Sequence, residues 1–342
     1  MQTLQKLELS HRLLYHPNHF PKEAIRAEHL EGLLEKLRRE GLAKEHLPSQ
    51  KELQRQGEYC KEKGIRLILS GEAEYPAALL DLPQIPPLLF TMGSLPTIEK
   101  VSIVGSRRCS SRGQSFARQL AERLSGEKLC IVSGLARGID RAAHEGAIEK
   151  GETLAVLGGG LDCIYPPEHG GLARKIMKEG ALISEFPPGC RPRPFHFPRR
   201  NRIIAALSRV LILVEAGEKS GALSTAMHAR ELGRSVMVAP SCPLNPAARG
   251  SNRLLLEGAL PVLSAGEVLE ELGWGKQGGR VWNCERAREE GITDLETLSL
   301  KSGWPLDRVL RELSDWERSG EVRRETGGRF HFLALAEEGP AS

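Results

Sequence analysis

VSIVGSRRCSSRGQSFARQLAERL, residues 101–124, decides the fold class of this chain. A run of β-branched and aliphatic residues stops at Gly105, a turn rich in serine and arginine follows, and apolar residues then recur with helical spacing. A strand that passes through glycine into a helix is a common phosphate site, because the first N–H groups of the helix point at the anion. The stretch therefore predicts an α/β fold with an anion site at this turn.

Further apolar segments of strand length alternate with helical segments after this junction. They are LCIVSG (129–134), TLAVLGGG (153–160), ALISEF (181–186), VLILVEA (210–216) and SVMVAP (235–240). Apolar strands separated by helices indicate a doubly wound parallel sheet that is covered on both faces. Ligands of such sheets bind beyond the carboxyl ends of the strands.

The segments on either side of the sheet predict smaller domains. The N-terminal segment has helical spacing, and the proline-rich passage at 74–90 cannot form a long helix, so we expect an extended lead-in there. Near the C-terminus two helical segments precede a hairpin that turns at Gly327-Gly328, which is the outline of a winged helix. The predicted parts are a helical N-terminal domain (1–65), the sheet domain (66–272), a linker (273–280), a winged-helix-like domain (281–336) and a tail (337–342).

Composition narrows the functional classes. The chain has 342 residues and a formal net charge of +4, so a nucleic-acid site would have to be a local feature. Its 7 cysteines include no CxxC pair, which argues against a disulfide framework and a zinc module. There is no signal-like start, and no run approaches the ~20 apolar residues that span a bilayer. We expect a cytoplasmic protein without membrane contact.

The first turn does not fit the common nucleotide motifs. GSRRCS lacks the GxGxxG pattern, the second strand ends in Ser133-Gly134 rather than in an acid, and no P-loop is present, so we expect no cofactor. Gly105 and Ser106 can instead bring backbone N–H groups to an anion, and Arg107 adds a guanidinium that can grip phosphate. The alternative is that the glycine only permits the turn and the arginine is solvated.

RPRPFHFPRRNRIIAALS, residues 191–208, is the most informative stretch. It carries a dense run of arginines, has no acid between Glu185 and Glu215, and interleaves aromatic residues with the charges. Arginines neutralise phosphates and aromatic rings stack on bases, so the stretch predicts a site for single-stranded nucleic acid. The alternative is that Phe195 and Phe197 are core residues beneath a solvated basic loop.

Two more turns at the same sheet edge precede helices. In SGLARGID (133–140), Asp140 either complements the helix dipole or contacts the ligand, and it shares a helix face with His144. No third metal ligand is in view, so we expect no metal. In SGALSTAMHA (220–229), the hydroxyl groups either meet phosphate or cap the helix.

Few carboxylates at this edge suit catalysis. Glu185 and Glu215, at strand ends, are the only ones that resemble catalytic acids or bases, and no GxSxG, HExxH or Ser/His/Asp arrangement is visible. We therefore expect a binding protein and not an enzyme.

The chain resembles the bacterial DNA processing protein A family, DprA or Smf, over about residues 65–272. The motifs that carry the resemblance are GSR (105–107), SGLARGID (133–140), LGGGLDCIYPPEH (157–169), ISEFPPG (183–189), FPRRNRIIAALS (197–208), EKSGALSTA (218–226) and RGSNRLLLEGA (249–259). The resemblance implies an extended Rossmann-like fold that binds and protects single-stranded DNA without hydrolysing it. It also implies a homodimer that helps to load a RecA-type recombinase in natural transformation.

The resemblance assigns residues by motif to the DNA groove and to the dimer. The DNA-binding residues are expected to be Gly105, Ser106, Arg107, Arg108, Gly134, Arg137, Gly138, Phe197, Arg199, Arg200, Asn201, Arg202, Ser220, Gly221, Ser224 and Thr225. The consecutive Leu254, Leu255 and Leu256 are expected at the dimer interface, unless they all pack internally.

The sequence departs from the family pattern in places. Many members have Lys where Pro167 stands, which removes one expected phosphate contact. The mixed charges of 305–318 favour partner binding or packing over readout of duplex DNA for the winged-helix-like domain. The alternative function is a nucleotide phosphoribohydrolase of the lysine-decarboxylase-like type, although its PGGxGT turn is absent. A pure protein adaptor would leave the arginine run unexplained.

Overall fold

The computed structural model describes residues 3–15, 30–39, 48–274, 284–302, 304, 306–325, 327 and 329–333. The chain forms two compact units, Met1–Ala265 and Gly266–Ser342. Most of the predicted linker, from residue 275 on, the predicted tail and Gly328 of the predicted hairpin turn lie outside the described residues.

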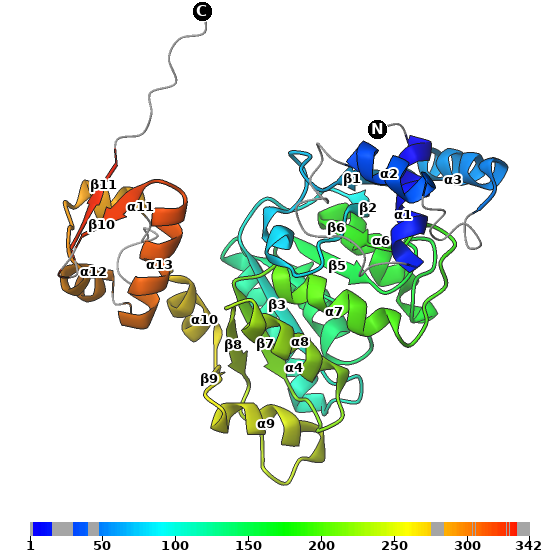
Figure 1. Ribbon diagram of the computed structural model, residues 1–342. Coiled ribbons are helices and arrows are strands. Elements are labelled where there is room, and N and C mark those ends of the chain that lie inside the picture. The colour runs from blue at the N-terminus through cyan, green and yellow to red at the C-terminus, as the bar shows by residue number, and fades with distance from the viewer. Residues whose placement is uncertain are drawn as a thin grey trace, which may run out of the picture. The chain divides into compact units, whose positions relative to one another are not determined.

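A nine-stranded sheet forms the centre of the first unit (Figure 1). Its strands are β1 (Arg66–Leu69), β2 (Leu88–Gly93), β3 (Lys100–Gly105), β4 (Cys130–Ser133), β5 (Thr153–Leu157), β6 (Ala181–Ser184), β7 (Val210–Val214), β8 (Ser235–Val238) and β9 (Leu260–Pro261). The spatial order is β1-β2-β6-β5-β4-β3-β7-β8-β9. All neighbours from β6 to β9 pair in parallel, so the predicted parallel sheet is confirmed.

Neither edge of the sheet was predicted, since β1 and β2 at one edge and the short β9 at the other lie outside the expected strands. β2 is antiparallel to both β1 and β6, and it begins at the end of the proline-rich passage. The expected extended lead-in therefore holds a 3₁₀ turn, η4 (Ala77–Asp81), and then a strand. The alternation of polar and apolar residues is weak here because β2 is buried over Leu88–Thr91.

Helices cover the sheet as the alternating pattern predicts (Figure 1). They are α4 (Ser111–Gly126), α5 (Ile139–Ala147), α6 (Gly170–Glu179), α7 (His196–Ala206), α8 (Gly221–Glu231) and α9 (Arg249–Leu256). α4 packs against α5, and α7 packs against α8. The central strands β4, β5 and β7 are buried along their whole length, which explains their mainly apolar sequences.

Among the described residues three helices precede the sheet, in line with the helical spacing of the N-terminal segment. They are α1 (Thr3–Tyr15), α2 (Leu30–Arg39) and α3 (Gln50–Lys63). Leu7, Leu34 and Leu53 are buried in the same hydrophobic cluster as the sheet core. Glu8 of α1 forms ion pairs with Arg12 and with Arg38 of α2. The limit at residue 65 stays a prediction, since these helices share the core of the first unit.

The second unit is small and mainly helical. It contains most of α10 (Ala265–Leu272), then α11 (Cys284–Glu289), α12 (Leu295–Ser302), α13 (Leu306–Arg318) and the antiparallel strands β10 (Val322–Arg324) and β11 (Phe330–Phe332). Trp304, Val309, Leu313 and Phe330 form its core. Arg308 is buried and donates to the Glu270 carbonyl at 2.7 Å, so α10 packs on α13. The expected helices and hairpin are present, and the winged-helix assignment stays a prediction.

Within the described ranges, no helix combines the length and apolar character needed to cross a lipid bilayer.

Candidate nucleic-acid interface

A cleft opens where the strand order of the sheet reverses. From β3 the chain moves to β4, β5 and β6 on one side, and β7 and β8 lie on the other side. Turns that leave neighbouring strands in opposite directions separate at such a point and leave a crevice at the carboxyl edge. The cleft here has a volume of about 990 Å³. Its lining comes mainly from residues 104–108, 192–194, 197–198, 200–201, 219–222 and 246–247, together with Asp140 and Tyr165.

The turn after β3 is fixed by its backbone. A Cβ on Gly105 would lie 1.9 Å from the Val214 carbonyl oxygen, so only glycine fits. Ser106 N donates to the Glu215 carbonyl at 2.7 Å, and the Ser106 hydroxyl accepts from Arg108 N at 3.0 Å. The side chains of Arg107 and Arg108 are exposed at the cleft.

Glu215 is a structural carboxylate. It is buried at the end of β7 with a left-handed φ of 52°. Its carboxylate accepts from Ser110 N at 2.7 Å, from the Ser110 hydroxyl at 2.5 Å and from Asn245 Nδ2 at 3.1 Å. These contacts hold three loops together at the sheet edge, so Glu215 is not free to act as a general base.

Aromatic side chains line part of the cleft. Phe197, in the first turn of α7, has the Arg107 guanidinium 4.8 Å above its ring centroid and the Tyr165 ring at 5.8 Å. Tyr165 is 45% exposed. An aromatic surface beside a guanidinium provides both a stacking face for a base and a charge for its phosphate.

Arg200 lies beneath this aromatic surface. Its side chain is buried, and Nη1 donates to the carbonyls of Gly134 and Val156, each at 2.6 Å. Burial lowers the pKa of Arg200 to about 10, against the opposing effect of Asp140. Arg200 lines the cleft, but its hydrogen bonds are directed into the protein.

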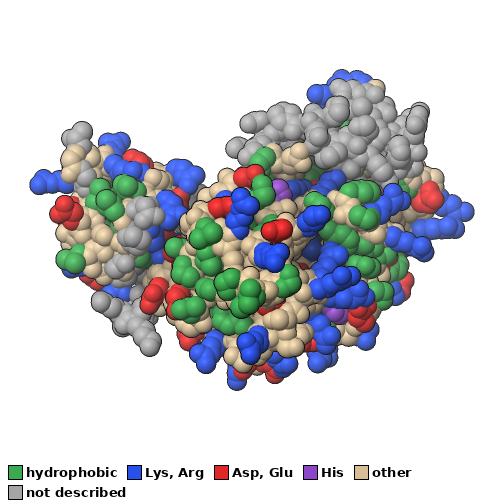
Figure 2. Space-filling view, turned by 90° about the horizontal axis from the view of Figure 1, so that it is seen from below, with side chains coloured by type: hydrophobic (Ala, Val, Ile, Leu, Met, Phe, Trp, Pro, Cys, Tyr) green, Lys and Arg blue, Asp and Glu red, His purple; other side chains and the backbone are tan. Residues whose placement is uncertain are grey.

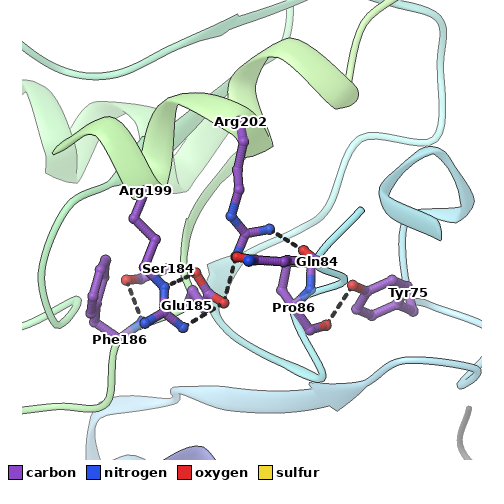
Figure 3. Close-up of polar contacts among 8 residues, drawn as sticks. All are labelled: Tyr75, Gln84, Pro86, Ser184, Glu185, Phe186, Arg199 and Arg202. Atoms are coloured by element: carbon purple, nitrogen blue, oxygen red, sulfur yellow. Dashed lines mark hydrogen bonds and ion pairs between the residues drawn. The ribbon is translucent and has the colours of Figure 1, made fainter. Parts of the chain in front are cut away.

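Arg199 and Arg202 point from α7 to Glu185 and do not line the cleft (Figure 3). Arg199 Nη2 lies 3.0 Å and Arg202 Nη2 lies 2.6 Å from Glu185 Oε1. Arg202 also donates to the Gln84 carbonyl. Burial raises the pKa of Glu185, but the two guanidiniums together hold it below its ordinary value. These contacts count against a direct phosphate role for Arg199 and Arg202, whose place in the groove stays a prediction.

Residues of the turn between β4 and α5 make close contacts within the protein. Gly138 has a φ of 76°, and a Cβ there would lie 2.3 Å from the Ser106 carbonyl oxygen. Gly134 and Arg137 line a side cavity of about 30 Å³, and Arg137 pairs with Glu168 at 2.6 Å.

Asp140 accepts from Gly134 N at 3.2 Å and from Ala136 N at 3.4 Å, and burial raises its pKa. His144 Nδ1 lies 2.7 Å from the Thr153 hydroxyl. In the ranges that the structure describes, no group of three potential metal ligands is present.

The N-terminus of α8 forms the opposite wall. Ser220 caps the helix by accepting from Ala222 N at 3.3 Å. Asn201 Nδ2 donates to the Gly221 carbonyl and to the Ser224 hydroxyl, both at 3.1 Å. Ser220, Gly221 and the buried Thr225 line the cleft, whereas Ser224 does not. Capping is therefore the observed role of Ser220.

Among the cationic and aromatic residues of the lining, three were not assigned to the site from the sequence: Tyr165, Arg193 and Lys219. Arg193 belongs to the arginine run and Lys219 to the EKSGALSTA motif. The sequence therefore showed both charges, but it did not show that their side chains line the cleft. The exposed cleft cations Arg107, Arg108, Arg193 and Lys219 have no carboxylate partner among the described residues. Figure 2 shows Lys and Arg side chains and exposed hydrophobic side chains on one face of the molecule.

The three consecutive leucines of α9 differ in exposure. Leu254 is buried, Leu255 is partly buried and Leu256 is 90% exposed. Leu260 and Leu263, which follow it, are 42% and 68% exposed. Only Leu256 of the expected interface residues offers a large apolar surface, and the dimer assignment stays a prediction.

The fold and the cleft define a class: an open α/β-sheet protein with a cation-rich, aromatic-lined cleft at the switch point of its strands. The family profile of DNA recombination-mediator protein A matches residues 66–273. The chain belongs to this family.

Relatives and solved structures of the same family are similar to this chain. The chain is 35% identical over 284 residues to Protein Smf of Escherichia coli. This alignment covers 77% of this chain and 76% of the relative. It is 40% identical over 220 residues to Protein Smf of Synechocystis, covering 62% of this chain and 55% of that relative's length. The crystal structure of DNA processing protein A from Streptococcus pneumoniae aligns with a TM-score of 0.63 and 32% identity, covering 79% of this chain and 95% of that one.

A second solved structure is described for the way in which its protein binds DNA. DNA processing protein A from Helicobacter pylori, described for its single-stranded DNA binding mode, aligns with a TM-score of 0.56 and 31% identity. The alignment covers 61% of this chain and 95% of that chain. The Rossmann-like sheet domain predicted from the sequence is thus confirmed.

Proposed function

We propose that this protein binds single-stranded DNA in the switch-point cleft, protects it and helps to load a RecA-type recombinase on it, without catalysing a reaction. The observation that carries the proposal is that four cations without carboxylate partners among the described residues, Arg107, Arg108, Arg193 and Lys219, share one cleft with the aromatic surface of Phe197 and Tyr165. Several cations suit a chain of phosphates better than a single nucleotide.

The aromatic surface favours a single strand over a duplex. Bases stack on side chains only when they are unpaired, and Phe197 and Tyr165 line the cleft together. The DNA-binding description of the Helicobacter pylori relative supports the same ligand. The recombinase and natural transformation enter the proposal through the family resemblance and its description as a recombination mediator.

The carboxylates argue for binding without catalysis. Glu185 is held by two arginines and Glu215 by Ser110 and Asn245. Asp140, the only carboxylate in the lining, is buried and accepts two backbone N–H bonds. A phosphoribohydrolase would need a carboxylate that is free to contact the reacting nucleotide.

A homodimer is part of the proposal. Leu256, Leu260 and Leu263 are exposed around α9 and the edge strand β9. Neighbouring exposed leucines at a sheet edge suit an interface between two copies, because burial of apolar surface stabilises association.

Titration of a labelled single strand at several salt concentrations tests the proposal. Four neutralised phosphates give a slope of log K against log salt of about −3, since each contributes roughly −0.7 on single strands. Arg107→Ala should weaken binding and reduce the slope by roughly 0.7. Arg118→Ala, on the exposed face of α4, is the matched control and should change neither. Undetectable or salt-independent binding, or nucleotide hydrolysis by the wild type, would refute the proposal.

A further inference from the structure

Phe195 is an exposed aromatic side chain at the mouth of the cleft. Its side chain is 63% exposed, although it lies two residues before Phe197. Pro192, Arg193 and Pro194 line the cleft directly before it, and Phe195 itself does not. The ring therefore lies next to the proposed DNA site and outside it. An exposed aromatic face at this place is available for a flat ligand to stack on.

The ring of Phe195 is held in place by its neighbour. His196 is buried, stacks on Phe186 at 4.2 Å and meets the Phe195 ring edge-to-face at 4.6 Å. His196 N donates to the Arg193 carbonyl at 2.9 Å, and His196 Nδ1 lies 3.2 Å from the Gly158 carbonyl oxygen. An exposed ring that is fixed by a buried partner loses little entropy when a flat ligand stacks on it.

The loop that presents Phe195 is braced and positively charged. Gly160 N donates to the Cys190 carbonyl at 2.8 Å, and on the facing loop Asp162 accepts from Gly189 N at 2.9 Å. Arg191 and Arg193 are exposed and form no ion pair with any residue that the structure describes. Two exposed arginines within four residues of an exposed ring are suited to hold the phosphates on either side of a stacked base.

We propose that Phe195 is a second stacking platform, on which a base of single-stranded DNA lies after the strand leaves the cleft, with Arg191 and Arg193 on the adjacent phosphates. This inference rests on the proposed function, because it continues the same strand over residues 190–195. The cleft holds a short strand by itself, and Phe195 contributes only to strands that are long enough to reach it.

Binding of short and long oligonucleotides to Phe195 variants tests the platform. Phe195→Leu keeps an apolar side chain and removes the aromatic face, whereas Phe195→Trp enlarges that face. For an oligonucleotide of about fifteen nucleotides, Phe195→Leu should weaken binding about tenfold and Phe195→Trp should bind at least as tightly as the wild type. For one of about four nucleotides, both variants should match the wild type. Melting temperatures should not change, since the side chain is mostly exposed.

Photocrosslinking gives a second readout that does not depend on affinity. Long single strands that carry 5-iododeoxyuridine at successive positions should crosslink to Phe195 from a position outside the segment that crosslinks to Phe197. Absence of any crosslink to Phe195, together with unchanged long-strand affinity of Phe195→Leu, would overturn the platform. Equal weakening of short and long strands would also overturn it, because Phe195 would then act through the cleft.

These failures are distinct from failure of the proposed function. If the wild type binds the short strand and Arg107→Ala weakens that binding, the proposed DNA site in the cleft is supported, whatever the result for Phe195. If the wild type binds neither strand, the proposed function fails and the platform fails with it. If Phe195→Leu loses only a protein partner while DNA binding is unchanged, the surface serves that partner and the platform is wrong.

Discussion

Replacement of Arg200 by alanine should damage folding before it damages DNA contact. The sequence predicts that Arg200 grips phosphate from the arginine run, but the side chain is buried and its Nη1 donates to two carbonyls at 2.6 Å. Arg200→Ala leaves the Gly134 and Val156 carbonyl oxygens without this donor and opens a cavity beneath Phe197.

The expected destabilisation follows from these contacts. Each buried carbonyl that loses its donor costs about 1–3 kcal/mol, and the relief of the buried guanidinium charge offsets part of this. The direction of this offset agrees with burial lowering the pKa of Arg200, since both reflect the cost of the buried charge. A net loss of about 2–4 kcal/mol in the free energy of unfolding lowers the melting temperature by roughly 5–15 °C in a domain of this size.

Thermal unfolding followed by circular dichroism measures the effect, with single-strand titration on the same samples. Arg107→Ala is the matched comparison, because Arg107 is exposed on the same aromatic surface. It should weaken DNA binding by about 1–3 kcal/mol and leave melting unchanged. If Arg200→Ala melted like the wild type and still lost DNA binding, Arg200 would contact the ligand and the structural assignment would be wrong.

Three further outcomes are expected. Glu185→Gln should lower the free energy of unfolding by about 2–4 kcal/mol, because two guanidiniums lose their carboxylate partner. It should not weaken DNA binding. Unchanged stability in a denaturant titration would contradict this prediction. Burial lowers the pKa of His144 to about 3, so as pH falls below 6.5 the unfolded chain takes up the proton first, and stability falls by up to about 1.4 kcal/mol per pH unit. His144→Gln should have a shallower dependence in denaturant titrations between pH 6.5 and 4, and equal slopes would refute the assignment. The paired change Leu256→Glu/Leu263→Glu should convert a dimer into a monomer, as measured by sedimentation. The protein concentration should be tens of micromolar, well above a ~1 μM dissociation constant. A monomeric wild type under these conditions would exclude the interface.

The linear order of residues predicts most of the sheet domain. Each strand from β3 to β8 coincides with a mainly apolar run, because a parallel strand buried on both faces needs apolar residues at most positions. Gly105 marks the turn for a local reason, since a Cβ would collide with β7. β2 was not predicted, because its pairing with β6 joins segments far apart in the chain.

The candidate site, too, was predicted in part from the sequence and in part only from the structure. The sequence by itself determined that arginines, aromatic residues and glycine turns gather at the carboxyl edge of a parallel sheet, because strand direction and helix starts follow from local pattern. Only the tertiary structure decided which of those side chains are free. Arg199 and Arg202 are held by Glu185 and Arg200 by two carbonyls, whereas Arg107 and Lys219 are exposed at the cleft. The reason is that a charge's partner is set by which distant segments pack together, and α7 meets the end of β6 only after the sheet has assembled.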